Sequence, residues 1–389
     1  MPPEGWLPTY FCVCDPSWPG LRPFDLLARY VVNWVRSSRP HSRRLYHRLL
    51  AVHTPSLEWL GVHAGHITGL MWRFGMTATD DASQSSASDW PDLPLAEWAD
   101  TCATLHLWTQ VVGKIRLAHA PMINHWWQVP LYVTCRGLTT SPIPYGVRRF
   151  QIDFDFIDHV LNIQTSDGNV ETMPLSPRSV ADFHAEVMAR LRGLGLETHI
   201  WTMPVEIDGA IPFDQDTEHR SYDRDYVNRF WRALVQVDRV FTLFRSRFLG
   251  KVSPVHFFWG SFDLAVTRFS GRTAPKLISN TPNVGAWVMQ EAYSHEVSSC
   301  GFWPGNGGFG RPAFFSYAYP EPDGFASAPV RPDATYYDTE LGQFILHYDA
   351  VRQAQAPDAA LMDYLRTTYA AAADLGHWDR AALERADGG

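Results

Sequence analysis

Two hydrophobic patterns alternate along the chain from about residue 90. Apolar residues at three- and four-residue steps predict helices. We place them at Leu95–Val112, from Ser176 to Gly193 or Gly195, at Tyr222–Leu249 and at Asp358–Leu375. Gly113 and Gly250 follow two of these patterns and are expected to end them. Short apolar or alternating runs predict strands, at Trp126–Cys135, Arg148–Phe156, His159–Gln164, Val170–Pro174, Leu196–Ile207, His256–Phe269, Trp287–Ser294, Ala313–Tyr319 and Gln343–Tyr348. Together these elements indicate an α+β fold with mainly antiparallel sheets.

Two stretches repeat the same order of residue types. Lys114–Arg136 and Lys251–Arg272 each begin after a glycine, continue to a proline, and place a histidine before two aromatic residues, His125 in the first and His256 in the second. The repeat predicts two pseudo-symmetric halves, about residues 89–207 and 208–376, each with helices packed on a sheet. We expect a ligand site between the halves, because pockets favour such interfaces.

Residues 1–88 differ from the rest of the chain. The first 76 residues hold eight Arg and no Lys, and the segment ends in the low-complexity run Thr77–Ser88. Such a run buries too little apolar surface to order itself. We therefore expect an N-terminal extension that is disordered or that starts from a misassigned codon, followed by one globular domain over residues 89–389.

Composition narrows the possible functions. The formal net charge of −8, with the acidic excess in the body, argues against nucleic-acid binding. Five scattered cysteines suit neither a disulfide framework nor a thiolate zinc site, so a reducing cytoplasm is expected. Neither a membrane span nor a secretory signal is apparent. Sixteen Trp residues favour an aromatic-lined pocket for a small molecule.

Histidines and one polar alternation are the strongest candidates for chemistry. His125 and His256 occupy equivalent places in the repeat, and Glu291, Tyr293 and His295 would share one face of a strand. Such imidazoles with a carboxylate suit acid–base catalysis, or a catalytic metal with Glu291, Asp158 or Asp263 as further ligand. The residues that would bind substrate are the anion clamp Arg268 and Arg272, the walls Trp126, Trp127 and Trp259, and the polar groups Asp263 and Tyr293. Intramolecular salt bridges and a solvated strand face are the structural alternatives.

Several long blocks resemble a known family. NHWWQVPLYVTCRGLTT, SPVHFFWGSFDLAVTRFSGR and YSHEVSSCGFWPG are similar to an uncharacterised bacterial domain-of-unknown-function family, numbered five-nine-nine-six, over roughly residues 89–384. The resemblance implies no activity and assigns no catalytic residue.

These observations lead to two hypotheses. The first is a cytoplasmic enzyme that acts on a small, partly apolar, anionic molecule by His/Glu acid–base chemistry, with metal assistance left open. The second is a non-catalytic ligand-binding or interaction module that uses the same aromatic residues. The cofactor and the oligomeric state are left open.

Overall fold

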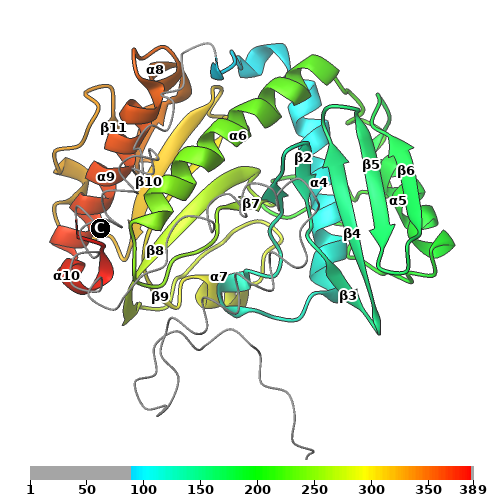
Figure 1. Ribbon diagram of the computed structural model, residues 1–389, viewed down its shortest axis with the longest axis horizontal. Helices are drawn as coiled ribbons and strands as arrows, with labels where there is room; N and C mark the ends of the chain where they lie inside the picture. The colour runs from blue at the N-terminus through cyan, green and yellow to red at the C-terminus, as the bar shows by residue number, and fades with distance from the viewer. Residues whose placement is uncertain (1–88, 387–389) are drawn as a thin grey trace, which may run out of the picture. The chain divides into compact units, whose positions relative to one another are not determined.

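A computed structural model describes residues 89–386, and the predictions for residues 1–88 lie outside that part (Figure 1). Its α-helices are α4 (Ala99–His119), α5 (Val180–Gly193), α6 (Arg224–Ser246), α7 (Ala286–Ala292), α8 (Tyr348–Arg352), α9 (Pro357–Leu375) and α10 (Arg380–Leu383). Its strands are β1 (Tyr132–Val133), β2 (Gly137–Thr139), β3 (Ile143–Tyr145), β4 (Arg148–Asp155), β5 (Val160–Thr165), β6 (Val170–Pro174), β7 (His256–Phe258), β8 (Asp263–Thr273), β9 (His295–Trp303), β10 (Ala313–Tyr319), β11 (Tyr336–Asp338) and β12 (Gln343–His347).

The strands form two antiparallel sheets, which confirms the α+β class. The first sheet has the order β1-β2-β4-β5-β6, with β3 also paired to β4, and the second has the order β11-β12-β10-β9-β8-β7. His125 lies in a 3-10 turn over Asn124–Trp126, whereas His256 begins β7. The two-repeat relation between the halves stays a prediction.

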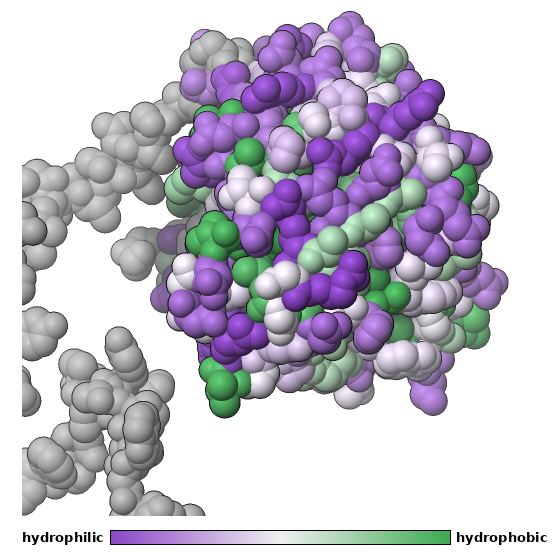
Figure 2. All heavy atoms as spheres, turned by 90° about the vertical axis from the view of Figure 1, so that its right-hand side faces the viewer, coloured by the Kyte–Doolittle hydropathy of each residue, from purple (hydrophilic) through white to green (hydrophobic). Residues whose placement is uncertain are grey.

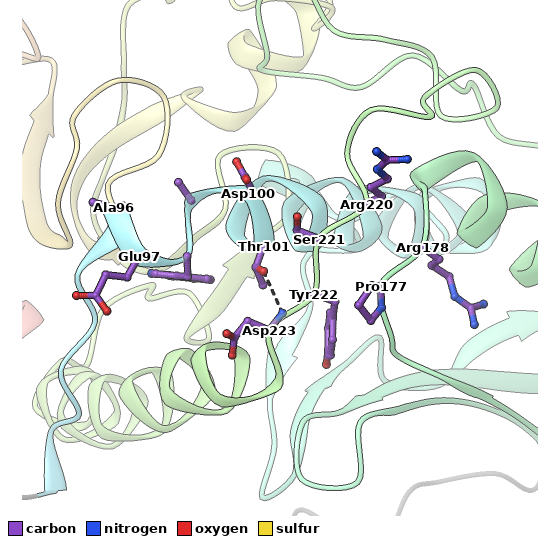
Figure 3. A pocket seen from close by; sticks show the side chains of 12 residues that line it. Ala96, Glu97, Asp100, Thr101, Pro177, Arg178, Arg220, Ser221, Tyr222 and Asp223 are labelled. Carbon is purple, nitrogen blue, oxygen red and sulfur yellow. Dashed lines mark hydrogen bonds between the residues drawn. The ribbon is translucent and has the colours of Figure 1, made fainter.

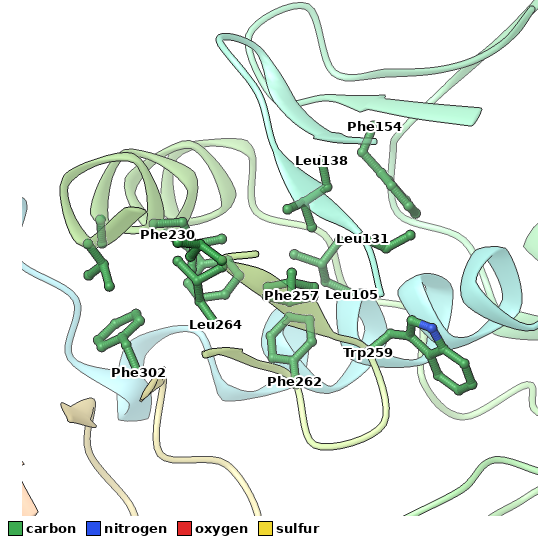
Figure 4. Close-up of a cluster of buried hydrophobic side chains, with 14 of the residues drawn as sticks. Leu105, Leu131, Leu138, Phe154, Phe230, Phe257, Trp259, Phe262, Leu264 and Phe302 are labelled. Carbon is green, nitrogen blue, oxygen red and sulfur yellow. The ribbon is translucent and has the colours of Figure 1, made fainter. Parts of the chain in front are cut away.

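One backbone pair links the two sheets. Leu131, next to β1, exchanges hydrogen bonds of 2.9 and 2.8 Å with Phe257 of β7. Their side chains are fully buried and meet residues from α4 and α6 in the core, including Leu105 and Phe230 (Figure 4). A continuous core therefore runs beneath both sheets.

Helix α6 covers one face of the second sheet together with α9. The Asp223 carboxylate caps the start of α6 by accepting hydrogen bonds from the backbone N–H groups of Asp225 and Tyr226. The buried side chains of α6 recur at helical spacing, at Val227, Phe230, Leu234, Val237, Phe241 and Phe244. Each large apolar side chain buried here contributes about 2 kcal/mol, so packing rather than helix propensity holds α6 in place.

Helix α4 continues past the glycine that was expected to end it. Gly113 lies inside the helix, and the Trp259 ring packs directly on it. A Cβ at this position would overlap the indole, which explains the glycine. Buried polar residues also line α4 at four-residue steps, at His106, Gln110 and Lys114. This polar stripe faces the loops that carry the candidate site.

Four strand predictions were wrong. The run His256–Phe269 is not one strand but the antiparallel pair β7 and β8, joined by a turn over residues 259–262. Trp287–Ser294 is mostly α7, since Ala286–Ala292 contains the good helix formers Ala, Met, Gln and Glu. Leu196–Ile207 forms no strand, and peptide groups of Trp201, Met203 and Val205 bond instead to side chains of α4. Within Trp126–Cys135 only β1 is a strand, since His125 and Trp126 have φ of 58° and 62° and belong to a turn.

The outer surface of the first sheet and α5 is mainly hydrophilic, with apolar residues scattered over it (Figure 2). Val147, Ile157 and Val170, from β-strand ends and turns of this sheet, are among its exposed apolar residues. Over residues 89–386, no helix is long and apolar enough to cross a membrane.

Candidate functional site

The two faces of the second sheet differ in character. Toward α6 and α9, β8 presents Leu264, Val266 and Arg268, whereas its other face carries Asp263, Ala265 and Thr267. On that other face Thr267 pairs with Ser299 of β9, which in turn pairs with Tyr317 of β10. The hydroxyls of Thr267 and Ser299 lie 2.8 Å apart. We call this surface, made by Asp263, Thr267, Ser299 and Tyr317, the polar face.

A carboxyl pair lies at one end of the polar face. Asp263 is 6% exposed and accepts a hydrogen bond from the Ser261 hydroxyl. Glu206 comes from a loop, and its carboxyl group lies against Gly260, where a Cβ would overlap Oε1. Burial raises the pKa of Asp263 to about 7. Burial, together with the charge of Asp263, raises the pKa of Glu206 to about 7 as well.

Glu206 is exposed to solvent, yet protein atoms surround its carboxyl group. Its charged form is therefore disfavoured although solvent or a ligand can reach the residue. Two neighbouring carboxyls of this kind can share a proton near neutral pH, as general acid and base do.

The loop that carries Glu206 is held by α4. The side-chain amide of Gln110 accepts a hydrogen bond from Val205 N–H and donates one to Val205 C=O, both at 2.9 Å. The Lys114 ammonium donates to the carbonyls of Trp201, at 3.1 Å, and Met203. Burial lowers the pKa of Lys114 to about 8.

The other side of this loop is also fixed. Glu206 N–H donates to Pro282 C=O at 2.8 Å, and Asn283 Nδ2 donates to Pro204 C=O at 2.9 Å. Glu206 itself has φ of 61°, a conformation that costs a non-glycine residue free energy. Contacts on both sides therefore hold its side chain toward Gly260 and Asp263.

Two tyrosines extend the carboxyl pair across the polar face. Tyr293 follows α7, and its hydroxyl lies 2.7 Å from that of Tyr317 on β10. Burial raises the pKa of both phenols, and the nearby Glu206 and Asp263 add to the shift at Tyr293. The phenols stay neutral at physiological pH and can donate hydrogen bonds to a ligand.

Three of the four predicted catalytic residues come together at the other end of β8. His125 Nδ1 donates to Ala292 C=O at 3.0 Å, so its Nε2 is an acceptor, and Lys251 Nζ lies 2.6 Å from that nitrogen. The His295 ring is 5.5 Å from the His125 ring. Burial lowers the pKa of His125, and the charge of the nearby Glu291 opposes this shift in part. We call His125, Lys251, Glu291 and His295 the histidine cluster.

The fourth, His256, lies on the same face but is covered. It pairs with Ala265 on β8, and the rings of Trp127 and Tyr132 lie 5.9 and 5.5 Å from its own. Burial lowers its pKa to about 3, and neither ring nitrogen has a hydrogen-bond partner among residues 89–386. Trp127 thus separates His256 from the histidine cluster.

The two arginines predicted to clamp an anion have intramolecular partners. Arg268 points to the helix face, where its guanidinium stacks 3.5 Å from the Phe244 ring centroid and donates to Phe244 C=O. Arg272 binds Glu296 and the carbonyl groups of Gly376 and His377. The structure therefore does not bring these guanidinium groups to the polar face.

The predicted aromatic walls are divided among several places. Trp127 lies beside the histidine cluster, with its ring 5.3 Å from Lys251 Nζ. Trp126 contacts Trp287 of α7, with ring centroids 5.1 Å apart. Trp259 is a core residue that donates its indole N–H to Val129 C=O.

Metal binding and thiol chemistry both depend on side-chain placement. Among residues 89–386, no three His, Cys, Asp or Glu side chains are grouped so that they could hold a metal ion. Cys300, on the helix face of β9, is buried, which raises the pKa of its thiol to about 12. It is therefore protonated at neutral pH and a poor nucleophile.

A separate hollow of about 640 Å³ lies between the start of α4 and the loop before α6 (Figure 3). Charged side chains line it, among them Asp100, Arg178 and Arg220. At its floor, however, Asp223 N–H donates to Thr101 Oγ1, and the Asp223 carboxylate caps α6. These polar groups have structural roles, so we treat the hollow as secondary to the polar face.

Sequence reasoning missed Glu206, Lys251 and Tyr317 as site residues. Lys251 belongs to the repeated Gly-Lys pair, which could have marked it. Tyr317 alternates with Phe315 and Tyr319 on a strand, so only its polar partners distinguish it. Glu206 depends on a loop conformation for which the sequence gives no periodic signal.

Comparison with known proteins gives one result. Residues 90–385 match the model of a family of unknown function, DUF5996. Neither a curated protein nor a solved structure matches the chain significantly.

Proposed function

Since the chain belongs to the DUF5996 family, whose function is unknown, we propose from the site geometry that it is an acid–base enzyme. It would act on a small, partly apolar, anionic molecule bound at the polar face. The carboxyl pair Glu206 and Asp263 would transfer the proton, and Tyr293 and Tyr317 would donate hydrogen bonds to the substrate. The observation that carries this proposal is the carboxyl pair itself.

The free-energy cost of burying the carboxyl groups of Asp263 and Glu206 supports a functional role. A strand face that only packs a core is apolar, whereas Asp263 occupies a buried position that an amide or an apolar residue would fill at lower cost. A like-charged neighbour, Glu206, adds to that cost. Such arrangements of perturbed carboxyls gather at active sites.

The histidine cluster supports the anionic and apolar parts of the substrate class. Lys251 forms the positive end of the face beside the imidazoles of His125 and His295, and the charge of Glu291 offsets that of Lys251 in part. The rings of Trp127 and Phe269 flank Lys251 at 5.3 and 5.0 Å from Nζ. A substrate with an anionic group and a small apolar part would fit between these groups.

A turnover screen tests the proposal. The full chain would be incubated with a library of small carboxylic and oxo acids, with binding followed by thermal shift and conversion by mass spectrometry. We expect a compound that the wild type converts, and about a hundredfold slower conversion by Glu206→Gln and Asp263→Asn with binding retained. Asp208→Asn, an exposed carboxyl in the same loop, is the matched control.

The screen also separates the two hypotheses. Binding without conversion would favour a non-catalytic binding module. Conversion that is unchanged in both carboxyl variants would show that the chemistry lies elsewhere.

A further inference from the structure

Lys251 and His125 have the arrangement of an activated nucleophile. The His125 ring has a contact on each nitrogen. Its Nδ1–H donates to Ala292 C=O at 3.0 Å, and its Nε2 faces Lys251 Nζ at 2.6 Å. The backbone carbonyl therefore fixes the tautomer, so that the lone pair of Nε2 points at the amine. A base held in this way, oriented by a third group, can take a proton from its neighbour.

The backbone around His125 supports this placement. His125 and the next residue, Trp126, both have positive φ, a strained conformation for bulky side chains. The residue is 5% exposed, and its ring is flanked by Phe269 at 4.7 Å and Trp127 at 5.4 Å between centroids. His125 thus has little freedom to turn away from Lys251.

Lys251 is accessible, unlike its partner. It is exposed by area, and its Nζ lies over the faces of Trp127 and Phe269. Burial lowers the pKa of its amine, against the charge of Glu291, which raises it. A lysine beside apolar rings and a neutral base has the setting that imine-forming lysines need.

We propose that Lys251 forms an imine with the carbonyl carbon of an oxo acid and that His125 is the base that frees its amine. This inference rests on the proposed function, because it names the substrate class for the same face. His295, whose ring lies 5.5 Å from that of His125, would hold the carboxylate of the oxo acid.

The step balances without another reactant. His125 Nε2 takes one proton from the Lys251 ammonium, and the free amine attacks the carbonyl carbon, so that a C–N bond forms as the C=O π bond breaks. One proton moves from nitrogen to the resulting alkoxide. Protonated His125 then returns its proton to the hydroxyl, which leaves as water while the C=N bond forms. The ammonium and the carbonyl compound have become a protonated imine and water.

The chain suits a trapping experiment because it has only three lysines, at positions 114, 251 and 276. The full chain would be treated with pyruvate and sodium cyanoborohydride, and the modified lysines identified by peptide mass spectrometry. Lys276 is exposed and reports non-specific labelling, whereas Lys114 is buried and bonded to carbonyl groups. Acetone, which lacks the carboxylate, is the uncharged comparison probe.

We expect the reduced adduct at Lys251, with Lys276 labelled far less and with pyruvate preferred over acetone. His125→Asn, which tolerates positive φ, should lower trapping at Lys251 by about tenfold or more. Lys251→Arg should abolish trapping there without changing the circular dichroism spectrum.

Equal labelling of Lys251 and Lys276, adducts mainly at Lys114, or no adduct on the folded protein would each overturn the inference. Trapping is measured without turnover, so its failure is distinguishable from failure of the carboxyl pair. Conversion that depends on Glu206 but proceeds without trapping would leave only the proposed function standing.

Discussion

The hydroxyl oxygens of Tyr293 and Tyr317 lie 2.7 Å apart, although one follows a short helix and the other lies on a central strand. Both phenols interact with the charge of Asp263. This contact ties the segment after α7 to the polar face and connects the two ends of the proposed site.

Asp263→Asn should stabilise the protein at pH 8. Because burial raises the pKa of Asp263 to about 7, the folded state binds its proton more tightly than the unfolded chain does. Its contribution to stability is therefore full at acidic pH and is lost as pH rises from about 4 to about 7. We expect Asn to raise the free energy of unfolding at pH 8 by about 2 kcal/mol, measured by urea denaturation, and to flatten this pH dependence.

The same variant should lose conversion of any identified substrate. A gain in stability joined to a loss of activity is the signature of a site residue. Asp263→Asn with lower stability at pH 8 than the wild type would contradict the assigned burial cost.

Gly260→Ala should displace the Glu206 carboxyl group without removing any functional group. The added Cβ would overlap Oε1, the far end of a flexible side chain, so the side chain can move at little cost in stability. We expect conversion to fall by about tenfold or more with a nearly unchanged melting temperature. Gly193→Ala, where the Cβ meets open space, is the matched control.

Gln110→Leu should loosen the loop that carries Glu206. The change leaves both the N–H and the C=O of Val205 without their 2.9 Å partners, which costs about 2 kcal/mol. Hydrogen exchange should accelerate over residues 201–208 first. In the control Thr109→Val, the lost hydrogen bond goes to His106 C=O within α4, so exchange in the loop should not change.

Cys300 should resist thiol reagents in the folded protein. Burial raises its pKa to about 12, whereas Cys135 is exposed. Iodoacetamide at pH 8 should label Cys135 and leave Cys300 unmodified until the protein is denatured. Rapid native labelling of Cys300 would mean that β9 is accessible from the helix face.

Elements with a strong local pattern could be predicted from the sequence. The strand Ala313–Tyr319 was predicted with its observed bounds, and α9 begins one residue before the prediction and ends where it was placed. Turn residues delimit the hairpin of β5 and β6, so its two strands were also found. In these places local propensity and tertiary packing favour the same structure.

The candidate site was harder to predict from the sequence, because it depends on contacts between distant segments. His125, Glu291 and His295 were chosen from a repeat and an alternation, yet they meet through a positive-φ turn and a helix rather than along one strand. Glu206 is positioned through its neighbour Val205, whose partner Gln110 lies ninety-five residues earlier. No periodicity in either segment encodes that contact.

The measurement that tests the central claim most directly is an NMR titration of the side-chain carboxyl groups of Glu206 and Asp263. We predict that both titrate near pH 7, in the coupled manner of neighbouring acids. In Asp263→Asn, the apparent pKa of Glu206 should fall, because the charge that opposes its ionisation is gone. Titration of both groups near the ordinary value of about 4, unchanged by removing either partner, would contradict the carboxyl pair and with it the proposed site.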